Sequence, residues 1–124
     1  MKLLIVDDSN LIRTRIASVV ESTQMKDVSI VGLARNGLDA LRIAQQTKPD
    51  VVTMDLTMPE MDGVETIRQM MKLIPPPNIL VVSALNDKST AIMALRLGAR
   101  GFINKPFTDQ ELRSALLDVA DITD

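Results

Sequence analysis

Short apolar runs alternate with longer amphipathic stretches along the whole chain, and this alternation constrains the fold more than any other feature of the sequence. The runs cover residues 3–6, 28–33, 51–54, 79–82 and, more weakly, 102–103. The first four are continuous, as expected of strands that are covered on both faces. Apolar residues recur at helical spacing between and after the runs. Five strands in alternation with five helices predict a parallel sheet with right-handed crossovers and helices on both faces.

The expected helices carry start and stop signals. Short polar side chains that can cap a helix precede three of them: Ser9 for the first helix, Asp62 for the third, and Thr108 or Asp109 for the last. Glu111 is placed to complete a capping box at the last helix. The third stretch carries an apolar stripe from Val64 to Ile74, and the prolines at 75–77 end it. Gly98 ends the fourth helix.

The composition excludes several classes of function. The 124 residues are 46% hydrophobic and 24% charged, which fits one globular domain that spans residues 1–124. The formal net charge of -2 argues against non-specific electrostatic binding to nucleic acid, so no direct nucleic-acid binding is expected. The chain has no Cys and no His, which excludes disulfides, thiolate or imidazole metal ligands and a Ser-His triad.

The sequence also lacks the marks of a membrane or secreted protein. No apolar run approaches the roughly 20 residues that a membrane span needs, so membrane insertion is not expected. Asp7 and Asp8 interrupt the first apolar run before it could act as a signal peptide. These features predict a cytoplasmic domain whose polar chemistry depends on Asp, Ser, Thr and Lys.

Polar residues directly follow four of the five apolar runs. They are Asp7 and Asp8 after the first run, Asp55 after the third, Ser83 after the fourth, and Asn104 and Lys105 after the fifth. Because ligands of open parallel sheets bind beyond the carboxyl ends of the strands, these residues should converge on one site. Clustered carboxylates repel one another unless a cation joins them, and oxygen ligands without His or Cys favour a hard ion. Mg²⁺ is therefore the expected metal.

An Asp beside Mg²⁺ and a Lys is suited to accept a phosphoryl group as an acyl phosphate, because a carboxylate can act as a nucleophile. The metal and the Lys would neutralise charge on the phosphoryl oxygens, which is most of what phosphoryl transfer requires of a protein. The residues that follow the strands thus predict a site that accepts a phosphoryl group.

Four motifs together resemble those of bacterial two-component response-regulator receiver domains of the CheY-like kind. They are Val-Asp-Asp-Ser at 6–9, Met-Asp-Leu-Thr-Met-Pro-Glu-Met-Asp-Gly at 54–63, Val-Ser-Ala at 82–84 and Lys-Pro-Phe at 105–107. Their order and spacing agree over essentially the whole chain. The resemblance implies a flavodoxin-like (βα)5 fold, a doubly wound parallel sheet with strand order 2-1-3-4-5. It also implies a signalling switch that catalyses only its own phosphorylation and dephosphorylation.

The resemblance assigns roles at the site, with a sensor histidine kinase or a phosphotransfer protein as the phosphoryl donor. By this resemblance, Asp55 is the phosphoacceptor, and Ser83 and Lys105 bind the phosphoryl oxygens. The implied Mg²⁺ ligands are Asp8 and Asp55 directly, Asp7 through water, and Thr57 through its backbone carbonyl.

The resemblance further implies a conformational switch on phosphorylation and a set of side chains that determine the lifetime of the acyl phosphate. Ser83 and Phe102 would change position on phosphorylation and alter the surface of the fourth helix, fifth strand and fifth helix, where a downstream output protein binds. The Lys105–Pro106 peptide bond would be cis. The positions two after the phosphoacceptor and two after the hydroxyl residue, here Thr57 and Leu85, would set the rate of dephosphorylation.

Other functions are compatible with parts of the same pattern. A Mg²⁺-dependent phosphatase could use Asp55 as its nucleophile, but the haloacid dehalogenase type carries a second Asp where this chain has Thr57, and 124 residues leave no cap domain. A flavodoxin-like cofactor binder would need aromatic residues beyond the two Phe, and a Gly-rich phosphate loop. A free-standing CheY-like protein and the receiver fragment of a larger regulator, such as a chemotaxis methylesterase, both fit the sequence.

Overall fold

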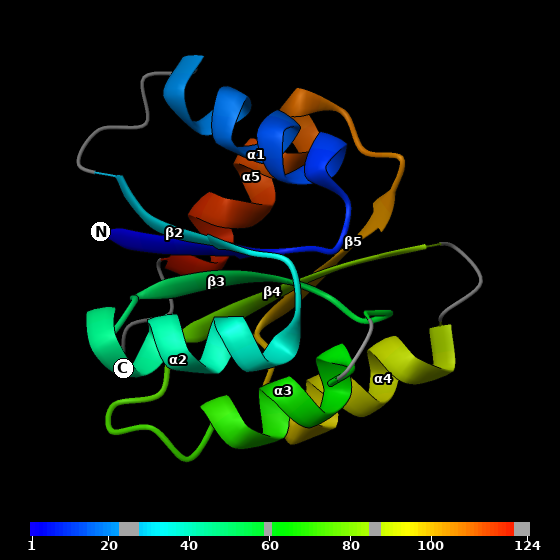
Figure 1. Ribbon diagram of the computed structural model, residues 1–124. Coiled ribbons are helices and arrows are strands. Elements are labelled where there is room, and N and C mark those ends of the chain that lie inside the picture. Colours follow the sequence, from blue (N-terminus) through cyan, green and yellow to red (C-terminus); the bar gives the residue numbers. More distant parts are fainter. Residues whose placement is uncertain (23–27, 59–60, 85–87, 121–124) are drawn as a thin grey trace.

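The computed structural model describes residues 1–22, 28–58, 61–84 and 88–120, and it shows a parallel five-stranded sheet in the order β2-β1-β3-β4-β5 (Figure 1). The strands are β1 (Lys2–Val6), β2 (Ser29–Ala34), β3 (Val51–Asp55), β4 (Asn78–Ala84) and β5 (Gly101–Lys105). The helices are α1 (Asn10–Ser22), α2 (Gly37–Thr47), α3 (Gly63–Met70), α4 (Lys88–Leu97) and α5 (Asp109–Ala120). The predicted flavodoxin-like fold and its strand order are confirmed.

Helices cover both faces of the sheet. In Figure 1, α1 and α5 lie on one face, and α2, α3 and α4 lie on the other. Alternate residues of β1 enter the two cores: Leu3 and Ile5 pack with α1 and α5, whereas Leu4 and Val6 pack with α2, α3 and α4. Burying each such side chain contributes about 1.5–3 kcal/mol. The continuous apolar run of β1 is therefore explained by a core on each side.

The expectation of a strand covered on both faces holds for β1, β3 and β4 but not for β2. The residues of β2 are mostly only partly buried, and Leu33 is 51% exposed. The reason is position, because β2 is an edge strand and pairs only with β1 within the described sheet. A continuous apolar run therefore did not distinguish an edge strand from a central one.

The predicted helix caps are confirmed. Ser9 Oγ accepts the amide of Ile12 at 3.3 Å, and Asp62 Oδ1 accepts the amide of Glu65 at 2.9 Å. The cap of α5 is Thr108, whose Oγ1 accepts the amide of Glu111 at 3.0 Å while the Glu111 carboxylate accepts the amide of Thr108 at 2.9 Å. This reciprocal pair is the expected capping box.

The ends of α3 and α4 differ in how well the sequence predicted them. Gly98 follows α4 with a φ of 126°, a conformation that favours glycine, as expected. The extension of α3 to Ile74 is wrong, because α3 ends at Met70 and Ile74 is 91% exposed. The chain has to reverse direction before β4 begins at Asn78, and the residue before a proline avoids the helical conformation. Apolar residues therefore continue at helical spacing beyond the residue at which the helix ends.

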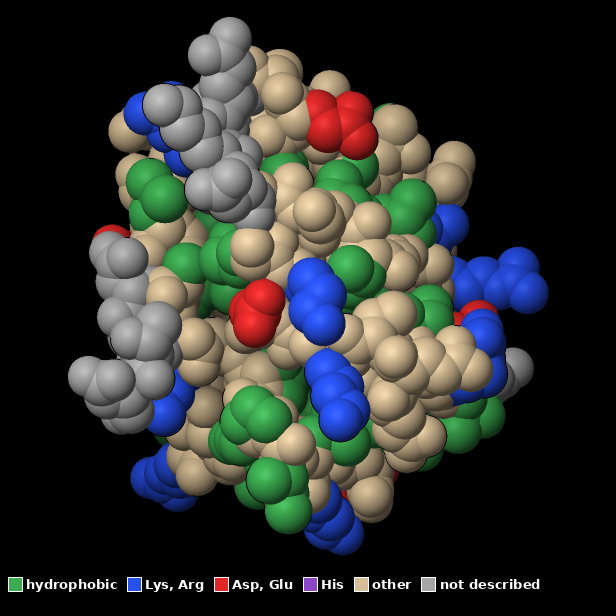
Figure 2. All heavy atoms as spheres, turned by 90° about the vertical axis from the view of Figure 1, so that its left-hand side faces the viewer, with side chains coloured by type: hydrophobic (Ala, Val, Ile, Leu, Met, Phe, Trp, Pro, Cys, Tyr) green, Lys and Arg blue, Asp and Glu red, His purple; other side chains and the backbone are tan. Residues whose placement is uncertain are grey.

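The face at the amino ends of the strands is shown in Figure 2, where charged and hydrophobic side chains are interspersed. A pocket on this face is lined by Lys48, Pro49 and Asp50 together with Pro75, Pro76 and Asn78. The polar residues that follow the strands in sequence lie at the opposite, carboxyl edge of the sheet. Within the described part of the chain, no helix is long and apolar enough to cross a membrane.

Candidate functional site

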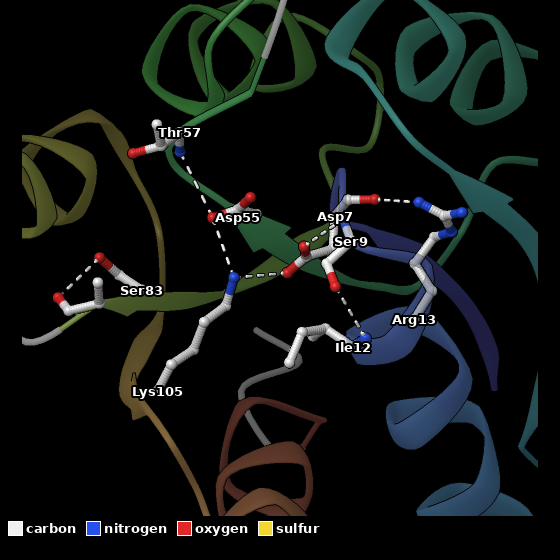
Figure 3. A network of polar contacts seen from close by, with 9 residues as sticks. Asp7, Ser9, Ile12, Arg13, Asp55, Thr57, Ser83 and Lys105 are labelled. Carbon is white, nitrogen blue, oxygen red and sulfur yellow. Dashed lines mark hydrogen bonds and ion pairs between the residues drawn. The ribbon is translucent and has the colours of Figure 1, made fainter.

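The carboxyl edge of the sheet gathers side chains from four strands (Figure 3). Asp7 follows β1, and Asp55, Ser83 and Lys105 lie at or near the ends of β3, β4 and β5. The strand order runs from β1 in opposite directions, to β2 on one side and to β3 on the other. A doubly wound sheet binds ligands at such a switch point, which here lies beside Asp7 and Asp55.

Three carboxylates form a compact cluster. Asp7, Asp8 and Asp55 each offer one oxygen, and these oxygens lie within 4.8 Å of one another. Asp7 and Asp55 are buried, at 1% and 5% exposed, whereas Asp8 is exposed. An oxygen-only donor set of this size, open to solvent through Asp8, fits a hard divalent cation that keeps several waters.

Lys105 is the cation that faces this cluster. Its Nζ lies 2.8 Å from Asp7 Oδ2 and 3.4 Å from Asp55 Oδ1. Burial lowers the pKa of Lys105, but the hydrogen bond to Asp7 and the negative charges of Asp55 and Asp7 outweigh it, and the pKa is raised overall. Lys105 therefore stays protonated at neutral pH and holds the two buried carboxylates together.

The titration of the Asp55 carboxyl group is strongly perturbed. Burial and the negative charge of Asp7 raise its pKa from the ordinary value of 3.8 to about 6. The charge of Lys105 and the backbone amide of Thr57, which is 3.4 Å from Asp55 Oδ1, oppose this rise without cancelling it. Asp55 is thus a carboxylate that lacks sufficient positive charge in its surroundings, and a metal ion would supply it.

Backbone contacts fix the position of Asp7. The Asp7 amide donates to the Ala34 carbonyl at 3.0 Å, and Asp7 Oδ1 accepts the Ser9 amide at 2.9 Å. Arg13 Nη1 donates to the Asp7 carbonyl at 2.6 Å from the first turns of α1. Sequence reasoning did not identify this role of Arg13, because no local pattern marks a side chain that reaches back to a strand end.

Glycine at position 63 allows the loop after β3 to close tightly. A Cβ added to Gly63 would lie 2.2 Å from the Asp55 carbonyl oxygen and 2.6 Å from Leu56 Cα. The Gly63 amide donates to the Leu56 carbonyl at 2.9 Å. Gly63 is the last residue of the 54–63 motif, and the reason for a glycine at this position is visible only in the structure.

Ser83 lies at the end of β4, next to the strand that carries Asp55, and Phe102 lies on β5 against α4. Ser83 is fully buried, and its Oγ donates to the Ala84 carbonyl at 3.3 Å (Figure 3). Phe102 is half-buried and lines a pocket with Lys88, Ala91, Ile92 and Leu95 on α4. The structure therefore places both predicted switch residues on the α4 side of the site.

The other predicted residues are found as follows. The Lys105–Pro106 bond is cis, as the resemblance implied. Thr57 contributes its backbone amide to the Asp55 carboxylate. Pro59 and Glu60 of the long motif, and Leu85, lie outside the described residues.

The raised pKa of Asp55 predicts an unusual pH dependence of the metal-free protein. The folded protein holds a proton on Asp55 up to about pH 6, whereas an unfolded chain loses it near 3.8. This stabilisation is complete below the unfolded value and is lost as the pH rises through the folded value. In a chelator, the free energy of unfolding should therefore increase by about 1 kcal/mol from pH 7 to pH 5.

Urea unfolding at several pH values measures this change, and Asp55→Asn is the control that should lack it. A wild-type stability that is flat or falls between pH 7 and pH 5, with no difference from Asp55→Asn, would contradict the prediction.

Comparison with known proteins agrees with this geometry. The family model for the response regulator receiver domain matches residues 3–117. Chemotaxis protein CheY of Listeria monocytogenes is 40% identical over 116 residues, which cover 94% of this chain and 95% of that protein. The protein-glutamate methylesterase/protein-glutamine glutaminase of Methanococcoides burtonii is 42% identical over 114 residues, which cover 90% of this chain and 32% of that protein.

A solved structure gives the same result. The response regulator domain of Thermotoga maritima CheB superposes with a TM-score of 0.86 at 32% identity, covering 100% of this chain and 98% of that one. These relatives give no support to the phosphatase alternative. The family match over most of the chain, and relatives at this level of identity, show that the chain belongs to the response regulator receiver domain family of two-component systems.

Proposed function

We propose that this receiver accepts a phosphoryl group on Asp55 from a histidine kinase or a phosphotransfer protein. The observation that carries the proposal is the cluster itself, in which Asp55 lies beside Asp7, Asp8 and Lys105 at the switch point of the sheet. A buried carboxylate with a neighbouring ammonium group and an open, oxygen-lined side has the groups that phosphoryl transfer requires.

The reaction on this chain is a simple displacement. An Asp55 oxygen attacks the phosphorus atom and forms the acyl phosphate, while the phosphorus–nitrogen bond of the donor phosphohistidine breaks and its imidazole leaves with the electron pair. Lys105 Nζ, 3.4 Å from Asp55 Oδ1, is positioned to neutralise a phosphoryl oxygen. The Thr57 amide offers a further hydrogen-bond donor on the same side.

The donor set fits Mg²⁺, which would neutralise charge on the phosphoryl oxygens during the transfer. Asp8 and Asp55 would bind it directly, Asp7 through water and Thr57 through its backbone carbonyl. Asp7 is suited to an outer position because Lys105 and the Ser9 amide already occupy its two oxygens. Asp8 is exposed and therefore accessible to a hydrated ion.

The face formed by α4, β5 and α5 would bind the output protein in response to phosphorylation. Among the described residues, four large apolar side chains are exposed on the helices of this face: Ile92, Met93, Leu95 and Leu117. The Ser83 hydroxyl would turn towards the phosphoryl group, and Phe102 would then move inward from its half-buried position. Differential contacts of the phosphoryl group supply the free energy of this shift.

The proposed setting is a cytoplasmic signalling pathway in which residues 1–124 act as one receiver, without insertion into a membrane or direct binding to nucleic acid. Its own phosphorylation and dephosphorylation would be its only catalysis. The chain spans nearly the whole length of the CheY relative and about a third of the methylesterase, so chemotaxis signalling is the proposed context.

Acetyl phosphate with Mg²⁺ tests the proposal without a cognate kinase. We expect intact-mass spectrometry to show one added phosphoryl group, and reduction of the acyl phosphate with borohydride to map it to Asp55. Phosphate on Asp7, Asp8 or Asp62, or no incorporation at all, would contradict the assignment.

Thr57 and Leu85 predict a long-lived acyl phosphate. Hydrolysis requires a water molecule in line with the phosphorus, and a polar side chain can hold it there. Threonine offers one short hydroxyl, and leucine cannot hydrogen-bond to water. The double change Thr57→Asn with Leu85→Glu should speed the loss of phosphate by about tenfold, which corresponds to ~1.4 kcal/mol in the barrier.

Decay of radioactive phosphate from purified wild type and double variant, at equal Mg²⁺, measures the two rates. The outcome that contradicts this prediction is a double variant that is phosphorylated normally and loses its label no faster than the wild type.

A further inference from the structure

Arg15, on α1, contacts the chain segment that follows Lys105. Its Nη2 donates to the Phe107 carbonyl at 2.5 Å, and its guanidinium carbon lies 4.6 Å from the centre of the Phe107 ring. The same nitrogen lies 3.4 Å from Asp109 Oδ1, at the start of α5. A guanidinium group can combine these contacts because it is planar, stacks on aromatic rings and carries several donors in a fixed arrangement. Arg15 thus connects α1 with the segment between β5 and α5.

The strand that carries Lys105 is held less firmly by the sheet than the strand that precedes Asp7. β5 pairs only with β4 within the described sheet, and each of its five residues is only partly buried. In contrast, β1 lies between β2 and β3, and its last four residues are buried. Contacts beyond the end of β5 therefore have to supply part of what holds Lys105 in place.

The link between Lys105 and Phe107 is short and has little conformational freedom. Only Pro106 lies between them, its ring fixes its φ angle, and a residue before a proline is largely confined to extended conformations. A shift of the Phe107 backbone is therefore passed on to Lys105. The Nζ of Lys105 lies 2.8 Å from Asp7 Oδ2 and 3.4 Å from Asp55 Oδ1, so even a small shift weakens these ion pairs.

The same helix also contacts the other side of the carboxylate cluster. Arg13 Nη1 donates to the Asp7 carbonyl at 2.6 Å (Figure 3). Arg13 and Arg15 are two residues apart on α1, which packs into the core on the same face of the sheet as Phe107. One helix thus holds both chain segments whose side chains form the ion pair between Asp7 and Lys105, and it can fix the distance between them.

We propose that Arg15 is a positioning residue that holds the Phe107 segment against α1 and so keeps Lys105 beside Asp7 and Asp55. The inference rests on the proposed function, in which Lys105 neutralises a phosphoryl oxygen on Asp55. The contacts of Arg15 are to Phe107 and Asp109, and it acts on the site only through Lys105. Arg15→Met keeps much of the apolar stem and removes the guanidinium group, so it isolates these contacts.

Beryllofluoride, a phosphoryl analogue, tests the proposal by calorimetric titration in the presence of Mg²⁺. Arg15→Met should bind it about tenfold more weakly than wild type, because a charged group held slightly out of position loses much of its interaction. Arg113→Met is the matched control, since it removes the same charge from an exposed position on α5 and should bind beryllofluoride as wild type does. Affinity is compared between folded proteins, so a general loss of stability does not by itself lower it.

Urea unfolding in a chelator gives a second readout that needs no bound analogue. If Arg15 acts through Lys105, the stability losses of Arg15→Met and Lys105→Met overlap. The double variant should then have a folding equilibrium constant about fivefold larger than the sum of the single losses predicts, whereas independent residues give additive losses. Arg113→Met combined with Lys105→Met should be additive. If Arg15→Met folds poorly, Arg15→Gln serves as a milder variant with the same expected directions.

The possible results separate the two claims. If wild type does not bind beryllofluoride, the proposed function fails, and the unfolding experiment still decides whether Arg15 positions Lys105. If wild type binds but Arg15→Met binds equally well, or if its stability loss is additive with that of Lys105→Met, the function stands and the role of Arg15 is overturned. Equally weak binding by Arg113→Met would overturn it too, because charge alone would then explain the effect.

Discussion

Asp55→Asn is expected to abolish phosphorylation by acetyl phosphate, with no shift of the label to another carboxylate. The amide cannot form an acyl phosphate, and the two neighbouring acids are poor substitutes for different reasons. Asp7 is buried, and its oxygens are held by Lys105 and by the Ser9 amide. Asp8 is exposed and lacks the ion pair with Lys105 that Asp55 has. The loss should therefore be complete at the sensitivity of intact-mass spectrometry.

Two controls make this result interpretable. Asp55→Asn should remain folded in metal-free buffer, because it removes a carboxylate whose pKa is raised by burial and by Asp7. Asp62→Asn changes an exposed cap of α3 and should accept phosphate normally. Retention of more than a trace of label in Asp55→Asn would show that another residue is the acceptor, and loss of label in Asp62→Asn would undermine the assignment equally.

The convergence of these residues could be predicted because it follows from topology. Asp7 and Asp55 come directly after an apolar run and Lys105 comes one residue later, and parallel strands bring such positions to one edge whatever the details of packing. The caps were predictable for a similar reason, since an N-cap oxygen bonds to an amide two or three residues away. The caps depend on the local sequence alone. The convergence depends on the local sequence and on the rule that parallel strands end at the same edge of the sheet.

Other features depend on packing that the sequence does not display. The apolar stripe through Ile74 has helical period, yet the helix ends at Met70 because the chain must return to β4. Adjacent Asp7 and Asp8 look alike in sequence, but one is buried against Lys105 and the other is exposed. The pairing of Ser83 with Asn104 requires the register of β4 and β5, which neither strand specifies alone.

Lys105→Met is expected to destabilise the metal-free protein by about 2 kcal/mol and to leave it far less affected in Mg²⁺. Breaking a buried ion pair by removing one partner commonly costs about 3–5 kcal/mol. The lower figure applies here because the Lys105 side chain is 23% exposed and Asp55 can take up a proton instead. Methionine retains most of the apolar stem, so the loss reports on charge rather than on packing.

Mg²⁺ distinguishes this electrostatic role of Lys105 from a structural one. Without the ammonium group, Asp7, Asp8 and Asp55 carry more uncompensated charge and should bind the cation more tightly, and a ligand that binds only the folded state raises its stability. Urea unfolding with chelator and with saturating Mg²⁺ should therefore show a large difference from wild type in the first condition and a small one in the second. Lys72→Met, at an exposed position, should match wild type in both. An equal loss of stability in Lys105→Met with and without Mg²⁺ would mean that the lysine stabilises the fold independently of the carboxylate cluster.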